Sequence, residues 1–225
     1  MSIRVKLYAA IAVAIAGLAL TAGVGIWALT HLSDRFDRVQ TAADARALAL
    51  QLKFDVTDFN GWQTAYGYDD GRSRPVFLAS VSRFRATLAL ARAKLPRPEE
   101  HKLVERVAAA ADDFMRLDRD AWAALQAGRR EEVKRLLLEP EIVNFKRAAA
   151  AAQELATLED RYAGREEQRF HSARHDALRL LIVAAIVASL LVALLLVTAN
   201  DLARAAERRL QEAEEAAGTD TGAGD

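Results

Sequence analysis

The stretch LLIVAAIVASLLVALLLVTA, residues 180–199, contains no charged side chain, and YAAIAVAIAGLALTAGVGIWALT, residues 8–30, contains none either. Apolar runs of 20 and 23 residues are long enough to cross a bilayer core of about 30 Å as helices. The 149 residues between them, 31–179, carry 26 basic and 24 acidic side chains. The sequence therefore predicts one charged module between two transmembrane helices.

The length of the first apolar stretch bears on topology. A cleavable signal peptide has about 7–15 apolar residues, whereas residues 8–30 continue into an amphipathic segment, so we expect an uncleaved anchor. The positive-inside bias acts on loops shorter than about 60 residues, and long domains cross membranes largely regardless of charge. We therefore expect residues 31–179 outside the cell (inner, cytoplasmic) membrane, with residues 1–7 and the short tail 200–225 in the cytoplasm.

Composition and motifs exclude several functions. The 31 basic and 31 acidic side chains cancel, which removes the general attraction to phosphate that nucleic-acid-binding proteins use. The absence of cysteine excludes disulfides and thiolate chemistry. No triad, glycine-rich phosphate loop or paired-carboxylate motif stands out, so we expect no enzymatic activity, cofactor or nucleic-acid partner. His171 and His175 share a helical face, but Arg169, Arg174 and Arg179 nearby disfavour a metal cation, and we expect no metal site.

The central module has a helical apolar pattern. The chain's four prolines, Pro75, Pro96, Pro98 and Pro140, are expected to divide it near residues 70–75, 96–98 and 139–140. Apolar residues then step by four and three, through Phe77, Val81, Phe84, Leu88, Ala91 and Leu95, and through Leu103, Val107, Ala110, Phe114, Leu117, Ala121 and Ala124. No strand-like alternation appears. We expect an all-α protein, a membrane-anchored antiparallel four-helix bundle flanked by two transmembrane helices.

One segment of the first helix combines aromatic, acidic and amide side chains. Aromatic walls with a few polar groups are typical of small-ligand pockets, and a carboxylate there would suit a cationic ligand. The candidate ligand-binding residues are Asp55, Asp58, Asn60, Trp62, Gln63 and Tyr66. The alternative is that the aromatic side chains cap the bundle core and the acids face solvent.

Two local sequences carry a family resemblance. The stretch LQAGRREEVKRLLL, residues 125–138, resembles the glycine and short helix that precede the last bundle helix in the sensor half of bacterial methyl-accepting chemotaxis receptors and related sensor kinases. The stretch DFNGWQTAYGYD, residues 58–69, is similar to an aromatic motif in a subset of these receptors. Over residues 1–200 the resemblance implies a chemotaxis-type sensor domain that passes a small-molecule signal across the membrane. Residues 200–225 depart from the family, whose members continue into a HAMP linker and signalling parts.

We therefore expect a receptor-like sensor module that detects an extracytoplasmic small molecule and signals through helix displacement and a partner chain. The alternative is a structural or accessory membrane protein whose bundle binds a protein in the envelope. Small residues four apart, Gly17, Thr21 and Gly25 in one span and Ala185, Ser189 and Ala193 in the other, favour close helix packing in lipid. They fit either a homodimer or packing between the two spans of one chain.

Overall fold

The computed structural model describes residues 3–220, some of them near both ends by their backbone alone. The helices are α1 (Ile3–Tyr68), α2 (Arg74–Lys94), α3 (Pro98–Gln126), α4 (Arg130–Leu136), the π-helical segment η1 (Leu137–Glu141) and α5 (Ile142–Asp220). No strand occurs in this part of the chain, so the expected all-α class is confirmed. Residues 1–2 and 221–225, the ends of the expected segments 1–7 and 200–225, lie outside the described residues.

The chain divides into two compact units. One comprises Phe36–Arg169, and the other combines the residues up to Arg35 with those from Phe170 onward. The division falls a few residues inside the expected module, residues 31–179. Helices α1 and α5 contribute residues to both units, whereas α2, α3, α4 and η1 belong to the Phe36–Arg169 unit alone.

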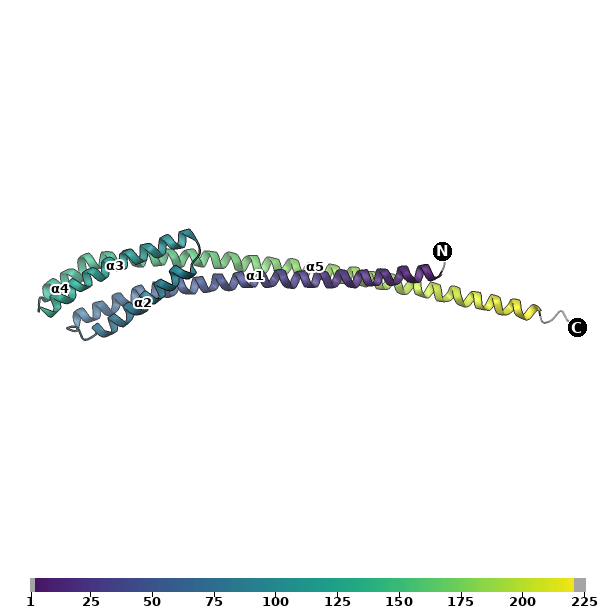
Figure 1. Cartoon of the computed structure of the whole chain (residues 1–225), viewed down its shortest axis with the longest axis horizontal. Helices are drawn as coiled ribbons and strands as arrows, with labels where there is room; N and C mark the ends of the chain where they lie inside the picture. Colours follow the sequence, from purple (N-terminus) through teal and green to yellow (C-terminus); the bar gives the residue numbers. More distant parts are fainter. Residues whose placement is uncertain (1–2, 221–225) are drawn as a thin grey trace. The chain divides into compact units, whose positions relative to one another are not determined.

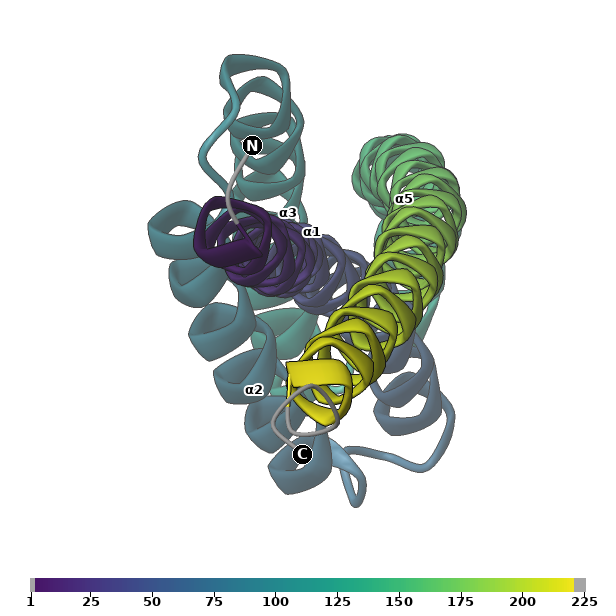
Figure 2. The ribbon, with the colours of Figure 1, turned by 90° about the vertical axis from the view of Figure 1, so that its right-hand side faces the viewer.

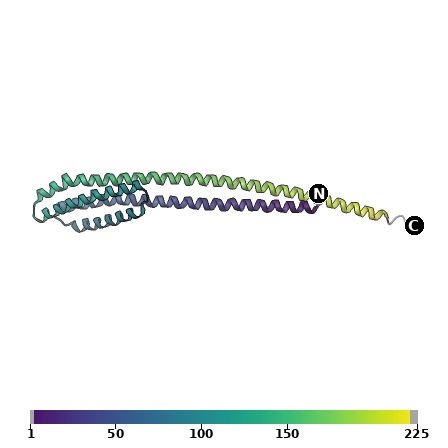
Figure 3. The ribbon, with the colours of Figure 1, turned by 45° about the horizontal axis from the view of Figure 1, so that its top comes forward.

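Within the Phe36–Arg169 unit, α2 and α3 run alongside the parts of α1 and α5 that belong to it, as Figure 1, Figure 2 and Figure 3 agree. One hydrophobic core joins these helices; its buried members include Leu52, Val56, Phe59, Phe77, Val81, Phe84, Val107, Ala110, Phe114, Ala148, Ala152 and Leu155. At its centre, the ring of Phe59 lies 5.1 Å from that of Phe84 and 5.0 Å from that of Phe114, between ring centroids. The four-three spacing in the sequence therefore marks buried faces.

The connections follow from local chemistry. Gly71 has a φ of 90°, and a Cβ there would lie 2.9 Å from the Trp122 ring, so glycine suits both the turn and the close packing against α3. Helix α3 begins with Pro98 and a capping box, in which the Glu100 carboxylate accepts a hydrogen bond of 2.7 Å from the Arg97 backbone N–H. It ends just before Gly128, whose φ is 73°.

The expected break at Pro140 is wrong. Residues 130–220 are helical throughout, and Pro140 lies inside η1. Proline lacks the N–H that an α-helix interior requires and its ring crowds the preceding turn. The wider π turn accommodates Pro140 and adjusts the helical register, so that Glu141 is buried beside two exposed residues, Glu139 and Pro140.

In the other unit, α1 and α5 each contain a stretch long and apolar enough, by length and composition, to cross a membrane, and only 11% and 6% of these stretches are buried within the structure. A Cβ at Gly17 would lie 3.3 Å from Leu191 Cδ1, so this small residue allows α1 and α5 to approach. Ala185, Ser189 and Ala193 are exposed.

Two leucines of α2 give a matched test of the core. Leu88 is 8% exposed and Leu78 is 53% exposed. We expect Leu88→Ala to lower the free energy of unfolding by about 2–5 kcal/mol, because it opens a cavity in the core. Leu78→Ala should change it by less than about 0.5 kcal/mol. Urea unfolding of the chain in detergent micelles, followed by circular dichroism, measures both; equal losses would contradict the assignment of the core face.

Candidate functional site

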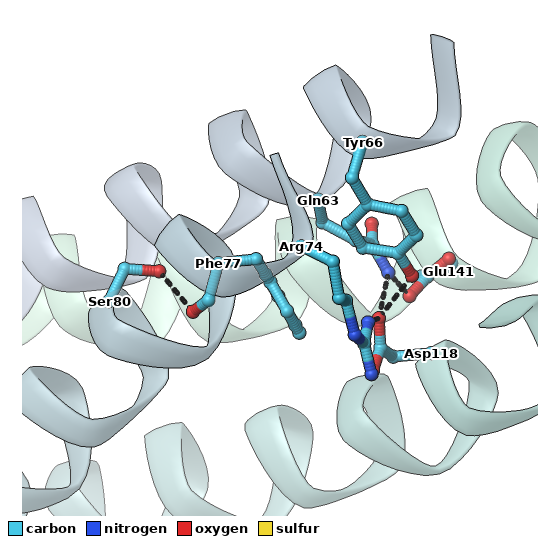
Figure 4. A network of polar contacts seen from close by, with 7 residues as sticks. All are labelled: Gln63, Tyr66, Arg74, Phe77, Ser80, Asp118 and Glu141. Carbon is cyan, nitrogen blue, oxygen red and sulfur yellow. Dashed lines mark hydrogen bonds and ion pairs between the residues drawn. The ribbon is translucent and has the colours of Figure 1, made fainter. Parts of the chain in front are cut away.

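Five polar residues from four elements meet inside the Phe36–Arg169 unit, and we name them the Asp118 cluster. Its members are Gln63 and Tyr66 of α1, Arg74 of α2, Asp118 of α3 and Glu141 of η1. Figure 4 shows their side chains converging. Gln63, Tyr66, Asp118 and Glu141 are each at most 3% exposed.

Asp118 is the shared acceptor of this cluster. Its Oδ1 accepts hydrogen bonds from Arg74 Nη1 at 2.6 Å and from the Tyr66 hydroxyl at 2.5 Å, with Gln63 Nε2 at 3.4 Å. A desolvated carboxylate is tolerated only when it is paired and hydrogen-bonded, and here a guanidinium and two neutral donors meet both needs. Burial, and then the Asp118 charge, raise the pKa of Tyr66, so its hydroxyl remains a donor.

Arg74 lies in a box of three aromatic rings. Its guanidinium carbon is 4.7 Å from the ring centroids of Tyr66 and Phe77, and 4.9 Å from that of Trp122. Ring faces attract cations, and the attraction grows when the cation is desolvated. Aromatic side chains from α1, α2 and α3 therefore enclose a cation that the chain itself supplies.

Glu141 is the carboxyl group of the cluster that keeps its proton. Gln63 Nε2 donates a hydrogen bond to its Oε1, and its Oε2 has no hydrogen-bond partner among the described residues. Burial, reinforced by the Asp118 carboxylate and opposed by Arg74, raises the pKa of Glu141 to about 9. At neutral pH the cluster therefore holds one guanidinium, one carboxylate and one uncharged carboxyl group.

A cavity of about 360 Å³, which we name the α4 cavity, lies beside this cluster. Its walls come from α1, from Asp70 in the turn between α1 and α2, and from the end of α3, α4, η1 and the first residue of α5. Leu125, Val133, Leu137, Leu138 and Ile142 supply apolar wall, and Asp70, Arg130 and Lys134 supply charge. The volume is within the about 300–1,000 Å³ typical of small-molecule sites.

The six candidate residues from the sequence do not form one site. Gln63 and Tyr66 belong to the Asp118 cluster, and Asn60 lines the α4 cavity. Asp55 is buried and accepts hydrogen bonds from Thr87 Oγ1 at 2.6 Å and Gln51 Nε2 at 2.8 Å.

The remaining two candidates, Asp58 and Trp62, contact each other. Trp62 is 36% exposed, and its Nε1 donates to the Asp58 carboxylate at 3.1 Å. The same carboxylate pairs with Arg83 of α2 at 2.6 Å. Asp55 and Asp58 thus each link α1 to α2.

Sequence reasoning missed three members of the cluster. Asp118 lies four residues after Phe114 and three before Ala121, so it continues an apolar stripe, and that position was the available signal. Arg74 follows a turn and is the first residue of α2, and this position in the sequence does not indicate that its side chain is buried. Glu141 is buried because of the π turn, a register that apolar periodicity does not report.

A second buried cluster, also missed, joins the start of α3 to α5. Arg97 Nη1 lies 2.8 Å from a Glu100 oxygen and 3.5 Å from a Glu159 oxygen, and both glutamates are fully buried. The Arg97 guanidinium stacks on Tyr162, 3.5 Å from the ring centroid. Burial, and then Glu100, raise the pKa of Glu159 to about 8. The two carboxyl groups therefore hold a proton between them at neutral pH. We name these residues the Arg97 cluster.

Comparisons of the chain with protein families, with characterised proteins and with solved structures find no match. Within the described residues, no group of three or more His, Cys, Asp or Glu side chains is arranged to hold a metal ion.

The two raised pKa values predict a pH dependence of stability. Between the ordinary pKa of 4.5 and the raised values of about 9 for Glu141 and about 8 for Glu159, the folded chain holds protons that the unfolded chain has released. The free energy of unfolding should fall as pH rises through this window, by up to about 1.4 kcal/mol per pH unit for each group. Glu141→Gln and Glu159→Gln should each flatten the slope.

Glu139→Gln is the matched control, because Glu139 is an exposed residue of the same π segment as Glu141. It should keep the slope of the unsubstituted chain. Urea unfolding between about pH 5 and pH 8 measures all four proteins. A slope unchanged by both buried substitutions would show that neither carboxyl group is protonated in the folded chain.

Proposed function

We propose that the chain is a membrane-bound, chemoreceptor-like sensor module without enzymatic activity of its own. In this proposal residues 31–179 form an extracytoplasmic antiparallel four-helix bundle, residues 8–30 and 180–199 cross the cytoplasmic membrane, and both termini are cytoplasmic. A small molecule bound by the bundle displaces α5 relative to α1, and a partner chain reads the displacement inside the cell.

The exposed apolar helices support the membrane part. Large side chains of the uncharged stretches are exposed, including Leu18 at 71%, Leu190 at 65% and Leu196 at 67%. Apolar surface on this scale is unfavourable in water, whereas a bilayer covers it.

One observation carries the signalling part: a single helix, α5, includes both a cavity wall and an apolar stretch. Its first residue, Ile142, lines the α4 cavity, and the same helix contains residues 180–199. Packed helices slide past one another by small steps, and a continuous helix passes such a step along its length. A ligand-induced shift at Ile142 therefore has a covalent, helical path to the apolar stretch.

A stripe of exposed residues on α1 supports self-association. We define the outer α1 stripe as Ala43, Ala47, Leu50, Phe54, Thr57 and Gly61, which step by four and three residues and are all exposed. Leu50 and Phe54 are 46% and 59% exposed. Steps of four and three residues are the spacing of the contact positions in a coiled coil. The occupant we propose is α1 of a second copy, in a parallel homodimer.

Topology is the first test of the proposal. The chain has no cysteine, so single cysteines at the exposed positions Gln126 and Ala205 report the side of the membrane on which each lies. A membrane-impermeant maleimide added to intact cells should label Gln126→Cys and leave Ala205→Cys unlabelled, and both should react after permeabilisation. Labelling of Ala205→Cys in intact cells would contradict the sensor proposal.

Crosslinking tests the homodimer. Cysteines at Leu50 or Phe54 should form disulfide-linked dimers under mild oxidation in membranes, because each would face its counterpart across the outer α1 stripe. Ala109→Cys, an exposed position on α3, is the control and should remain monomeric. Equal crosslinking at all three positions would indicate random collision, and the dimer through this stripe would be wrong.

A further inference from the structure

The α4 cavity combines apolar walls with two cations at one side. Lys134 and Arg130 are one helical turn apart on α4, and Asp70 is the acidic residue among the lining side chains. The lining therefore carries two formal positive charges and one negative charge. Glu131, the partner of Lys134, lies outside the lining, so the groups that line the cavity offer more cationic donors than acidic acceptors, which favours an anion over a cation.

Both cations are held by exposed ion pairs. Arg130 Nη2 lies 2.9 Å from an Asp70 oxygen, and Lys134 Nζ lies 2.9 Å from a Glu131 oxygen, with all four side chains at least 59% exposed. Exposed pairs of this kind contribute little free energy and re-form easily. A ligand carboxylate at the cavity mouth can therefore take the place of either acid without a large cost.

The cavity walls limit the size and the polarity of the part of the ligand that lies beyond its carboxylate. Val133 is buried and Leu125, Leu137 and Ile142 are half-buried, so a ligand in the cavity replaces water on apolar surface. A volume of about 360 Å³ is near the lower end for small-molecule sites, which favours a small ligand. Extra carboxylates would be buried against leucines without partners, at high cost.

We propose that the α4 cavity binds a small monocarboxylate with an apolar body, its carboxylate on Lys134 and Arg130 and its body against the leucine walls. The class includes short fatty acids and simple aromatic acids, which share this chemistry. The assignment rests on the proposed sensor function, for which it names the ligand class.

The cavity wall also connects the ligand to the Asp118 cluster. Leu137 lines the cavity and covers Gly67 so closely that a Cβ at Gly67 would overlap Leu137 Cδ1. Leu137 is the first residue of η1, and Glu141, its last, contacts Gln63. A ligand that displaces Leu137 therefore displaces η1, the segment that contains Glu141 and directly precedes α5.

Calorimetric titration of the full chain in lipid nanodiscs tests the ligand class. The probes are benzoate and hexanoate, with benzamide as the uncharged match to benzoate. Both acids should bind saturably, and benzamide at least about tenfold more weakly, because it lacks the charge that Lys134 and Arg130 recognise. Lys134→Met and Arg130→Met should each weaken benzoate binding about threefold to fivefold, as expected for exposed ion pairs.

Arg135→Met is the matched control, since Arg135 is an exposed cation of α4 outside the cavity lining; it should leave benzoate affinity unchanged within about twofold. Gly67→Ala adds a methyl group to the cavity lining and displaces Leu137, so it should weaken binding of both acids while the charges remain. Circular dichroism confirms that each variant keeps its helical content.

Three results would overturn the proposal: equal affinity for benzamide and benzoate, equal losses in Arg135→Met and Lys134→Met, or no binding of either acid up to about 10 mM. None of these alters maleimide labelling, so the sensor proposal would stand with another ligand. Conversely, labelling of Ala205→Cys in intact cells would reject the sensor while leaving acid binding intact.

Discussion

The ion pair between Arg74 and Asp118 sets the conditions for the end of the Phe36–Arg169 unit at which α1, α2, α3 and η1 meet. Both side chains are nearly removed from water, at 12% and 4% exposure, and desolvation of two charges costs several kcal/mol each. Three aromatic rings around the guanidinium and two further donors to the carboxylate offset this cost. A second ionised carboxylate beside the pair would have no matching cation, and Glu141 is accordingly neutral.

The same charge logic operates in the Arg97 cluster, where one arginine faces two buried carboxyl groups and one of them keeps its proton. Both clusters matter because the α5 side of the core is built largely from alanine, as at Ala148, Ala151 and Ala152. Small side chains resist sliding weakly, since neighbouring registers bury similar surface. Buried ion pairs, by contrast, form in one register only, so they fix where α5 and α3 lie along their neighbours.

The sequence predicts the helical class and the apolar faces, because these depend on residue type and on a period of 3.6 that any helix obeys. It does not predict the clusters. A polar residue on an apolar stripe, such as Asp118, breaks the apolar pattern in the sequence. Its burial can be explained only when its partners on other helices are known. The prediction of a break at Pro140 was wrong for a related reason. The π turn satisfies the backbone hydrogen bonds locally, and the spacing of apolar side chains does not indicate a π turn.

The proposed response at the cavity has a structural consequence at the π segment: it would be discrete rather than graded if η1 converts to α geometry. A π turn holds one residue more than an α turn, and its conversion to α geometry shifts the following register by one residue, about 100° of rotation. Such a rotation would move the Glu141 carboxyl group away from its hydrogen-bond donor, Gln63. Intermediate rotations would leave a buried carboxyl group without any partner, which is costly. The positions of Leu137 and Glu141, at the two ends of η1, are therefore coupled. Helix α5 begins at the next residue, so its register depends on the register of η1.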